Sequence, residues 1–185
     1  MNDNAYNEYY KKIDYFGKPY LGLRNFFKKH YPKGTVLDLG CGQGRDSIFL
    51  GRLEYQVTGI DISEVGISQM SDIAKKEKLP LKGLVADIYS YTITDEYDII
   101  LLDSMLHFYK NDVERETKLF VRIVKELKIS GVICNFMLKS NKNEKYLKKI
   151  IKDSGIKFEV ICDDYTEYPE GNFKYHMYVI RKLTM

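Results

Sequence analysis

From residue 35 onward, short β-rich runs alternate along the chain with segments of helical periodicity, and this alternation restricts the possible folds more than any other feature. The β-rich runs 35–39, 56–61, 81–87, 97–103 and 131–137 predict strands. Helical periodicity marks the segments 45–53, 63–77, 112–127 and 142–152. Strands joined through helices run parallel, so the sequence predicts an α/β fold with a doubly wound sheet and helices on both faces.

The last two predicted strands, 156–164 and 174–183, have only the turn-rich segment "YTEYPEGNF" between them. This segment is too short for a parallel crossover, so the two strands should form an antiparallel hairpin. The predicted sheet therefore has seven strands, is mostly parallel and ends in a C-terminal antiparallel hairpin.

The N-terminal segment and two helix starts add local detail. Apolar residues at helical spacing, interrupted at Gly17 and Pro19, predict two amphipathic helices in a segment 1–32 that precedes a domain 33–185 within one structural unit. Pairs of polar residues predict helix caps, Asn111 with Glu114 and Asn141 with Glu144.

Composition excludes several classes of protein. The chain has 185 residues and a formal net charge of only +3, so no strong overall field attracts nucleic acid. Its three cysteines, Cys41, Cys134 and Cys162, lack metal-ligand spacing and are odd in number, which argues against a structural zinc site and a disulfide framework. No signal peptide or membrane-spanning run is recognisable. We therefore expect a cytoplasmic protein without a metal ion, either monomeric or homodimeric.

The stretch "VLDLGCGQGRDS" places Gly40, Gly42 and Gly44 directly after the first predicted strand. Ligands of parallel sheets bind beyond the C-terminal strand ends, and glycines there let a ligand approach the bare backbone. A tight strand-to-helix turn can also use glycines for purely structural reasons. A dinucleotide fingerprint would need its third glycine where Arg45 stands, which weighs against a dehydrogenase.

Acidic residues follow the glycine turn at the predicted C-terminal ends of successive strands. Asp38, Asp61, Asp87 and Asp103 occupy four such ends, and Asp61 stands where a carboxylate can accept both hydroxyls of a ribose. Each aspartate alone could be a helix cap or a solvated loop residue. Together they predict a polar rim around one nucleoside-sized site.

The order Asp-x-Gly-x-Gly-x-Gly, "GIDIS", "ADIYSY", "YDIILLDSMLHF" and a closing hairpin resembles the class I S-adenosylmethionine-dependent methyltransferases, whose sheet is Rossmann-like. The resemblance covers roughly Lys33 to Leu183 and is greatest to small-molecule enzymes of the tellurite-resistance and thiopurine type. It implies S-adenosyl-L-methionine as cofactor and S-adenosyl-L-homocysteine as product. The implied cofactor residues are Asp38, Gly40, Cys41, Gly42 and Gly44 for the methionine portion, Asp61 for the ribose, Ile62, Asp87 and Ile88 for adenine, and Asp103 and Ser104 beside the transferred methyl group.

The acceptor is less constrained by the sequence. His107, after the fourth strand, is the best-placed candidate for a general base, although a packing or capping role accounts for it equally well. The "DSML" loop lacks the motif of enzymes that methylate exocyclic amines of bases or glutamine amides. Tyrosines of the N-terminal segment are candidates for a lid or for acceptor contacts, with Tyr168 from the C-terminal hairpin, and they suit a small enclosed acceptor: Tyr6, Tyr9, Tyr10, Tyr15 and Tyr20.

Two alternatives stay open from the sequence. The chain could methylate tRNA or protein, or it could be a non-catalytic nucleoside-binding domain of the same fold. The acidic residues Asp163, Asp164, Glu167 and Glu170 are expected in a loop at the ligand edge, where they would repel a polyanion. We expect for this reason a small-molecule acceptor rather than a nucleic acid.

Overall fold

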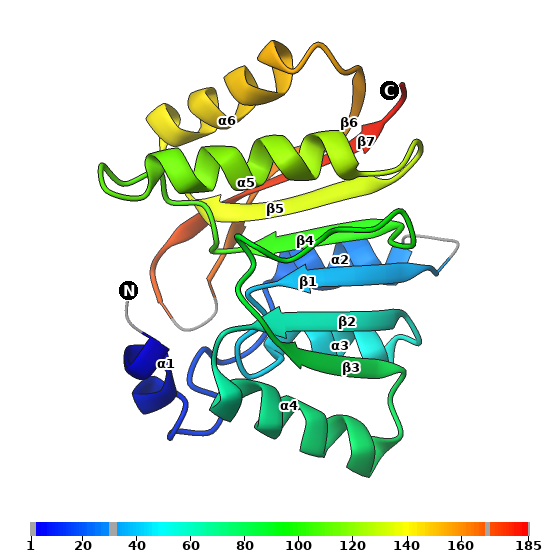
Figure 1. Ribbon diagram of the computed structural model, residues 1–185, viewed down its shortest axis with the longest axis vertical. Helices are drawn as coiled ribbons and strands as arrows, with labels where there is room; N and C mark the ends of the chain where they lie inside the picture. Colours follow the sequence, from blue (N-terminus) through cyan, green and yellow to red (C-terminus); the bar gives the residue numbers. More distant parts are fainter. Residues whose placement is uncertain (1–2, 30–32, 169–170, 185) are drawn as a thin grey trace.

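A computed structural model describes residues 3–29, 33–168 and 171–184 of the chain, with side chains from residue 6 onward. Figure 1 shows the elements in chain order. The helices are α1 (Asp3–Tyr9), α2 (Leu21–Lys29), α3 (Arg45–Arg52), α4 (Glu64–Glu77), α5 (Val113–Glu126) and α6 (Asn141–Asp153). The strands are β1 (Thr35–Leu39), β2 (Gln56–Asp61), β3 (Leu81–Val85), β4 (Ile99–Asp103), β5 (Val132–Leu138), β6 (Phe158–Glu167) and β7 (Lys174–Lys182).

The strands form one seven-stranded sheet in the order β3-β2-β1-β4-β5-β7-β6. The strands β1 to β5 pair in parallel, whereas β7 pairs antiparallel with both β5 and β6. This confirms the predicted mostly parallel sheet with its C-terminal antiparallel hairpin. Figure 1 shows α1 at the edge toward which the parallel strands point.

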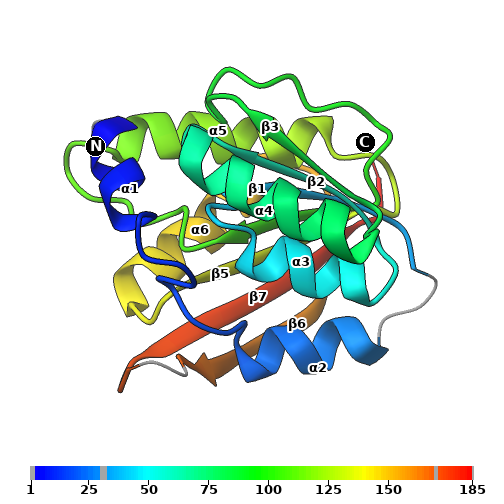
Figure 2. The ribbon, with the colours of Figure 1, turned by 90° about the horizontal axis from the view of Figure 1, so that it is seen from below.

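Helices cover both faces of the sheet, as the alternating pattern predicted. Figure 2 shows α5 on one side of the sheet and α2 and α3 on the other. Along β4, Ile99 and Leu101 pack into the core on the α2–α3 side, and Ile100 and Leu102 pack into the core on the α5–α6 side. A strand buried on both faces has no polar alternation, which explains why the central strands are continuous apolar runs.

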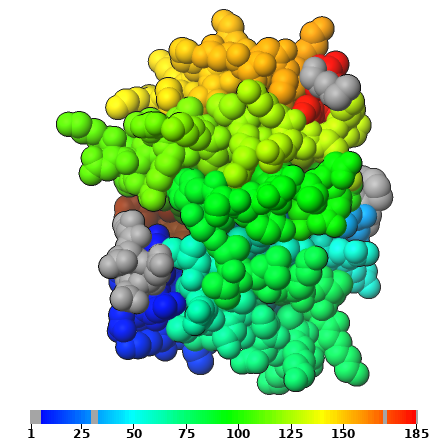
Figure 3. Space-filling view, in the orientation of Figure 1, coloured from blue at the N-terminus to red at the C-terminus, as the bar shows by residue number. Residues whose placement is uncertain are grey.

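The N-terminal segment forms the two predicted amphipathic helices, but the first of them ends earlier than the apolar spacing predicted. The helix α1 ends at Tyr9, and residues 10–20 form turns and irregular backbone before α2 begins. Ile13, predicted on a packed helical face, is 73% exposed. Asp14 and Gly17 have positive φ angles of 53° and 65°, which are incompatible with a continuous helix. Figure 3 shows the described part of this segment (blue) packed against α4 at one end of the molecule.

Both predicted helix caps are wrong by one residue. The helix α5 follows Asp112, whose side chain makes no capping hydrogen bond. The helix α6 follows Ser140, whose hydroxyl accepts from the backbone N–H of Asn143, while the Glu144 carboxylate accepts from the Ser140 N–H at 2.9 Å. Because Asn and Ser have similar capping preferences, the sequence "KSNKNE" does not distinguish the two positions.

The strand β6 extends three residues beyond the predicted end, to Glu167. Asp163, Asp164 and Glu167, expected in a loop, lie in this strand instead, and Glu170 lies outside the described residues. A break in register between Val160 and Cys162 shifts the pairing of the strand with β7. Such bulges let an edge strand continue past a disruption of its ladder.

Candidate functional site

The sheet order reverses between β1 and β4, and this reversal creates the crevice where open α/β sheets bind ligands. The chain leaves β1 toward α3 on one face of the sheet and leaves β4 toward α5 on the other. The loops after these two neighbouring strands therefore diverge. The predicted turn Gly40–Gly44 follows β1, and Asp103 is the last residue of β4.

The glycine turn has the backbone conformation that the sequence predicted. Gly40, Gly42 and Gly44 have φ angles of 79°, 54° and 83°, a region that L-residues rarely adopt. A Cβ atom added at Gly42 would lie 2.5 Å from the Tyr10 hydroxyl, and one added at Gly40 would overlap the Met105 sulfur. The turn thus presents backbone without Cβ atoms on the side where the Met105 and Tyr10 side chains pack.

Asp61 connects the end of β2 to the glycine turn. Its Oδ2 accepts from the Gly42 N–H at 2.9 Å, and its Oδ1 accepts from the Ser63 N–H at 2.8 Å. The carboxylate is 8% exposed, and burial raises its pKa although these backbone bonds oppose the shift. Carboxylate oxygens have further lone pairs, so Asp61 retains capacity to accept from a ligand hydroxyl.

Asp38 lies beneath the turn on β1. Its carboxylate is 2% exposed and accepts from the Ser47 hydroxyl at 2.6 Å. Burial, and then the nearby charge of Asp46, raise its pKa to about 7. The site therefore carries a carboxyl group that titrates near neutral pH.

Arg45, the first residue of α3, is a site residue that sequence reasoning missed. Its guanidinium donates to Asp46 Oδ2 at 2.9 Å, forms an ion pair with Asp103 across the crevice, and lies 4.7 Å from the centroid of the Tyr20 ring. A cation at a helix N-terminus opposes the helix dipole and requires compensating carboxylates. A basic residue directly after a glycine turn is the sequence signal that could have revealed this cluster.

Ser104 lies next to this cluster and has a positive φ of 58°. Its hydroxyl donates to Asp103 Oδ1 at 2.9 Å and lies 3.3 Å from the Tyr20 hydroxyl. The predicted residues Asp103, Ser104 and Tyr20 are therefore brought together, with Arg45 among them.

The N-terminal tyrosines differ in their positions. Tyr10 and Tyr20 are buried, at 3% and 1% exposure, whereas Tyr15 is 39% exposed. The Tyr6 ring lies 6.0 Å from the Tyr10 ring, and burial together with Asp61 raises the pKa of both hydroxyls. The Tyr168 hydroxyl donates to the Phe16 carbonyl at 3.2 Å, so the hairpin also reaches this segment.

Gln43, inside the glycine turn, holds the N-terminal segment in place. Its amide nitrogen donates to the Lys12 carbonyl at 2.9 Å, and its amide oxygen accepts from the Tyr15 N–H at 3.0 Å. Gln69 on α4 donates to the Tyr10 carbonyl at 2.8 Å. The glycine turn therefore borders the crevice and also binds the N-terminal segment through Gln43. No sequence pattern indicated the second contact.

His107 lies in the loop between β4 and α5 and is fixed mainly through its backbone. The buried Glu116 carboxylate accepts from the N–H groups of His107 and Phe108 at 2.9 and 2.6 Å, and the Asn143 amide donates to the His107 carbonyl at 2.7 Å. The imidazole stacks on Tyr109, and its Nδ1 lies 4.0 Å from Glu116 Oε1, beyond hydrogen-bond distance.

The three residues expected around adenine differ in their burial and in their partners. Asp87 is exposed and accepts from the Tyr89 N–H at 2.9 Å in a local turn, while Ile62 is half-buried. Ile88 is buried in the core beneath α5, where Arg122 donates to its carbonyl at 2.8 Å. Cys41 is buried in a small cluster with α3 and α4.

Among the acidic residues of β6, Asp163 is paired, whereas Asp164 and Glu167 are exposed. Asp163 forms an ion pair with Lys148 and hydrogen-bonds His176 Nε2, the latter at 2.7 Å. These partners lower the pKa of the Asp163 carboxyl against the effect of its partial burial. Asp163 is therefore compensated, which weakens the expected repulsion of a polyanion.

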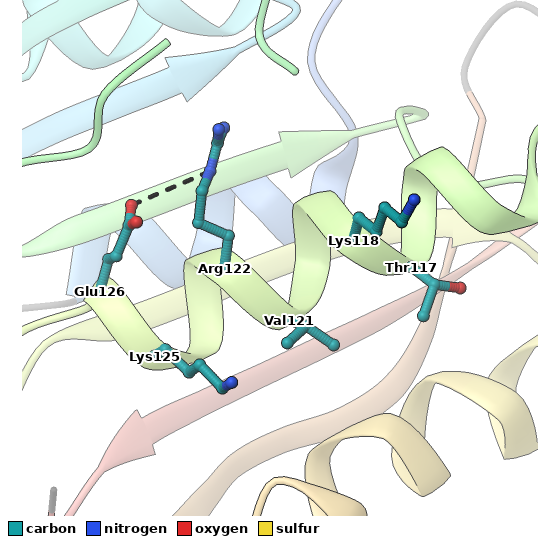
Figure 4. A pocket seen from close by; sticks show the side chains of 6 residues that line it. All are labelled: Thr117, Lys118, Val121, Arg122, Lys125 and Glu126. Carbon is teal, nitrogen blue, oxygen red and sulfur yellow. Dashed lines mark ion pairs between the residues drawn. The ribbon is translucent and has the colours of Figure 1, made fainter. Parts of the chain in front are cut away.

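A hollow of about 310 Å³ lies on the exposed side of α5, away from the strand ends (Figure 4). Arg122 and Glu126 form an ion pair of 3.9 Å across it, so its charges are partly compensated. None of the predicted site residues lines it. Within residues 3–29, 33–168 and 171–184, no group of three or more His, Cys, Asp or Glu residues is arranged to hold a metal ion, and no helix suffices in length and apolarity for a membrane span.

Comparison with known proteins identifies relatives of this arrangement. The family model described as "Tellurite resistance protein TehB" matches residues 7–149. A relative from Haemophilus influenzae, named "Probable S-adenosyl-L-methionine-dependent methyltransferase TehB", is 36% identical over 109 residues. The match covers 56% of this chain and 38% of the relative, so the chain spans about two fifths of the length of that curated protein.

Solved structures share the fold. The structure of TehB from Haemophilus influenzae has a TM-score of 0.72 at 24% identity and covers 97% of this chain and 66% of its own. A Burkholderia thailandensis 1,6-didemethyltoxoflavin-N1-methyltransferase, solved with 1,6-didemethyltoxoflavin and S-adenosylhomocysteine, has a TM-score of 0.78 at 15% identity. That comparison covers 98% of this chain and 87% of the other.

Proposed function

The chain belongs to the TehB family of tellurite resistance proteins, and from this premise we propose that it transfers a methyl group from S-adenosyl-L-methionine to a small-molecule acceptor. The observation that carries the proposal is the bond from the Gly42 N–H to Asp61 at the reversal of the sheet order. It joins the positive-φ turn after β1 to the carboxylate at the end of β2, as a nucleoside-bearing cofactor requires.

The residues of the crevice fit this cofactor. The atoms nearest to a Cβ added at Gly40 or Gly42 belong to the Met105 and Tyr10 side chains, so a ligand that approaches the turn would displace side chains and not backbone. The buried carboxylates Asp38 and Asp61 complement a ligand that carries an ammonium and a sulfonium group. S-adenosyl-L-methionine, when bound, supplies a methyl group already activated by its positive sulfur.

We assign the cofactor contacts residue by residue. The turn residues, with Asp38 below them, would hold the methionine portion, and Asp61 would accept from the ribose hydroxyls. The assignment of Ile62, Asp87 and Ile88 to adenine follows the family resemblance. Asp103 and Ser104 would border the transferred methyl group, with Tyr20 beside them.

In the proposed reaction the chain mainly aligns the acceptor and excludes water. Methyl transfer from a sulfonium is an in-line displacement, in which positioning supplies much of the rate. Tyr10 and Tyr20 are buried over the crevice, which supports a small and largely enclosed acceptor. If the acceptor arrives protonated, His107 is the candidate base, although its imidazole now stacks on the exposed Tyr109.

Two measurements test the proposal. Calorimetric titration should show micromolar binding of S-adenosylmethionine and S-adenosylhomocysteine, and absence of heat with both would contradict it. Radiolabel transferred from the cofactor into cell extract should then appear in the low-mass fraction. Label in RNA or protein would instead support a macromolecular acceptor.

A further inference from the structure

Arg45 contacts three parts of the chain that are far apart in sequence. It donates to the neighbouring Asp46, pairs with Asp103 at the end of β4, and donates to the Phe16 carbonyl at 3.4 Å. Its side chain is 15% exposed, although it carries a charge. Buried cations persist only where carboxylates and hydrogen-bond acceptors surround them.

The Phe16 carbonyl is a point where these parts of the chain meet. It accepts from Arg45 on one side and from the Tyr168 hydroxyl, at 3.2 Å, on the other. The Tyr20 ring, four residues later, lies under the Arg45 guanidinium and stacks on Phe136 and Tyr175 of the sheet. Arg45 therefore lies between residues 10–20, here called the covering segment, and the end of β4.

Lysine could not make the same set of contacts. The guanidinium is planar and carries five donors, so one Arg45 side chain can reach two carboxylates, a carbonyl and an aromatic face together. An ammonium group has three donors around a point charge and loses the stacked geometry. Arginine is thus chemically required for the complete set.

Resting on the proposed function, we propose that Arg45 is a positioning residue of the methyl-transfer site, which ties the N-terminal segment to Asp103 and so encloses the acceptor. The cofactor is held by the other half of the crevice, through the turn and Asp61. Loss of Arg45 should consequently impair enclosure of the acceptor far more than binding of the cofactor product.

The test compares Arg45→Met and Arg45→Lys with wild type by three measurements. These are the Kd of S-adenosylhomocysteine, the initial rate of label transfer into the low-mass fraction of cell extract, and hydrogen exchange at Tyr15 and Gly17. The amide of Tyr15 donates to Gln43 in the glycine turn, and the amide of Gly17 donates to the Asp14 carbonyl within the covering segment. Arg181→Lys is the matched control, because Arg181 pairs with Glu159 at 2.9 Å and lies opposite Val132 at the start of β5, at the other end of the sheet from the strand ends that carry the site.

For Arg45→Met we expect exchange at both amides to rise about tenfold and label transfer to fall about tenfold, with a Kd change below about threefold. Arg45→Lys should show smaller changes of the same kind and guards against a folding failure of Arg45→Met. A merely structural role would lower the melting temperature and weaken product binding in proportion. That result, or unchanged exchange in both folded variants, would overturn the inference.

The experiment separates this inference from the proposed function. Hydrogen exchange reports the tie between Arg45 and the covering segment whether or not methyl transfer occurs. Wild-type protein that binds neither cofactor nor product refutes the proposed function. Wild-type protein that transfers label, with Arg45→Met transferring at the same rate, refutes only the role of Arg45.

Discussion

The two halves of the crevice are built in different ways. The cofactor half, proposed to hold S-adenosyl-L-methionine, includes the turn 40–44 with the ends of β1 and β2. Its hydrogen bonds from Gly42 to Asp61 and from Ser47 to Asp38 lie within a stretch of 24 residues. The acceptor half consists of residues 10–20, the end of β4 and the β6–β7 hairpin. Its contacts join Phe16 to Tyr168 and Arg45 to Asp103.

The geometry of the cofactor half thus depends on contacts within one part of the chain, whereas that of the acceptor half depends on contacts between distant parts. In the cofactor half, glycine conformations and short-range hydrogen bonds keep the geometry even if the N-terminal segment moves. In the acceptor half, most contacts require that segment to lie over the strand ends. We therefore expect a shared cofactor site within the family and an acceptor site that is adjustable through the covering segment.

The largest expected effect comes from Gly42→Val, which should disable the cofactor half. Valine at a φ of 54° is strained, and its Cβ would lie 2.5 Å from the Tyr10 hydroxyl. We expect the affinity for S-adenosylhomocysteine, measured by calorimetry, to fall by at least about 100-fold. Gly155→Val is the control, since Gly155 also has a positive φ, of 72°, but has open space around it. A Kd within threefold of wild type for Gly42→Val would show that the turn does not contact the cofactor.

Asp61→Ala should have the next largest effect. It leaves the N–H groups of Gly42 and Ser63 without their acceptor and removes the proposed ribose contact. The unpaired donors lower stability with and without ligand, so the change in affinity comes from the lost ribose contact. A hydrogen bond to a charged group contributes about 1.5–3 kcal/mol, and we expect product affinity to fall about 10- to 100-fold. The exposed Asp72 on α4 offers Asp72→Ala as a control for the loss of one negative charge. Equal losses in both variants would mean that only net charge matters.

The smallest expected effect concerns the protonation of the Asp38 carboxyl group in the cofactor half. The pKa of Asp38 rises from 3.8 to about 7 on folding because the group is buried, so the native state binds its proton more tightly than the unfolded state. The stability that this group contributes is therefore present below about pH 4 and lost as the pH rises through 7. Urea unfolding of wild type should show this decline between about pH 4 and 7, with no further change from Asp38 above that range, and Asp38→Asn should flatten it. Identical pH slopes in the two proteins would contradict the assignment.

Much of the fold was predictable, because hydrophobic periodicity and connection length determine which strands are parallel. Hydrophobic periodicity misplaced the ends of two elements, the first helix and the strand β6. The residues Ile13 and Phe16 have helical spacing, yet positive φ at Asp14 and Gly17 interrupts the helix there, and Ile13 is exposed. The strand β6 continues past its predicted end at Asp164 to Glu167 because pairing with β7 satisfies its backbone.

The cofactor half was largely determined by the sequence alone, since glycines and strand-end aspartates stand at fixed offsets from a recognisable strand. Only the tertiary structure decided the acceptor half. No sequence pattern predicts that the Phe16 carbonyl meets Arg45 and Tyr168, or that Gln43 bonds the covering segment. The physical reason is that these contacts join residues 28 to 152 positions apart through single hydrogen bonds. Such contacts leave no periodicity in the chain and form only when the sheet brings the strand ends together.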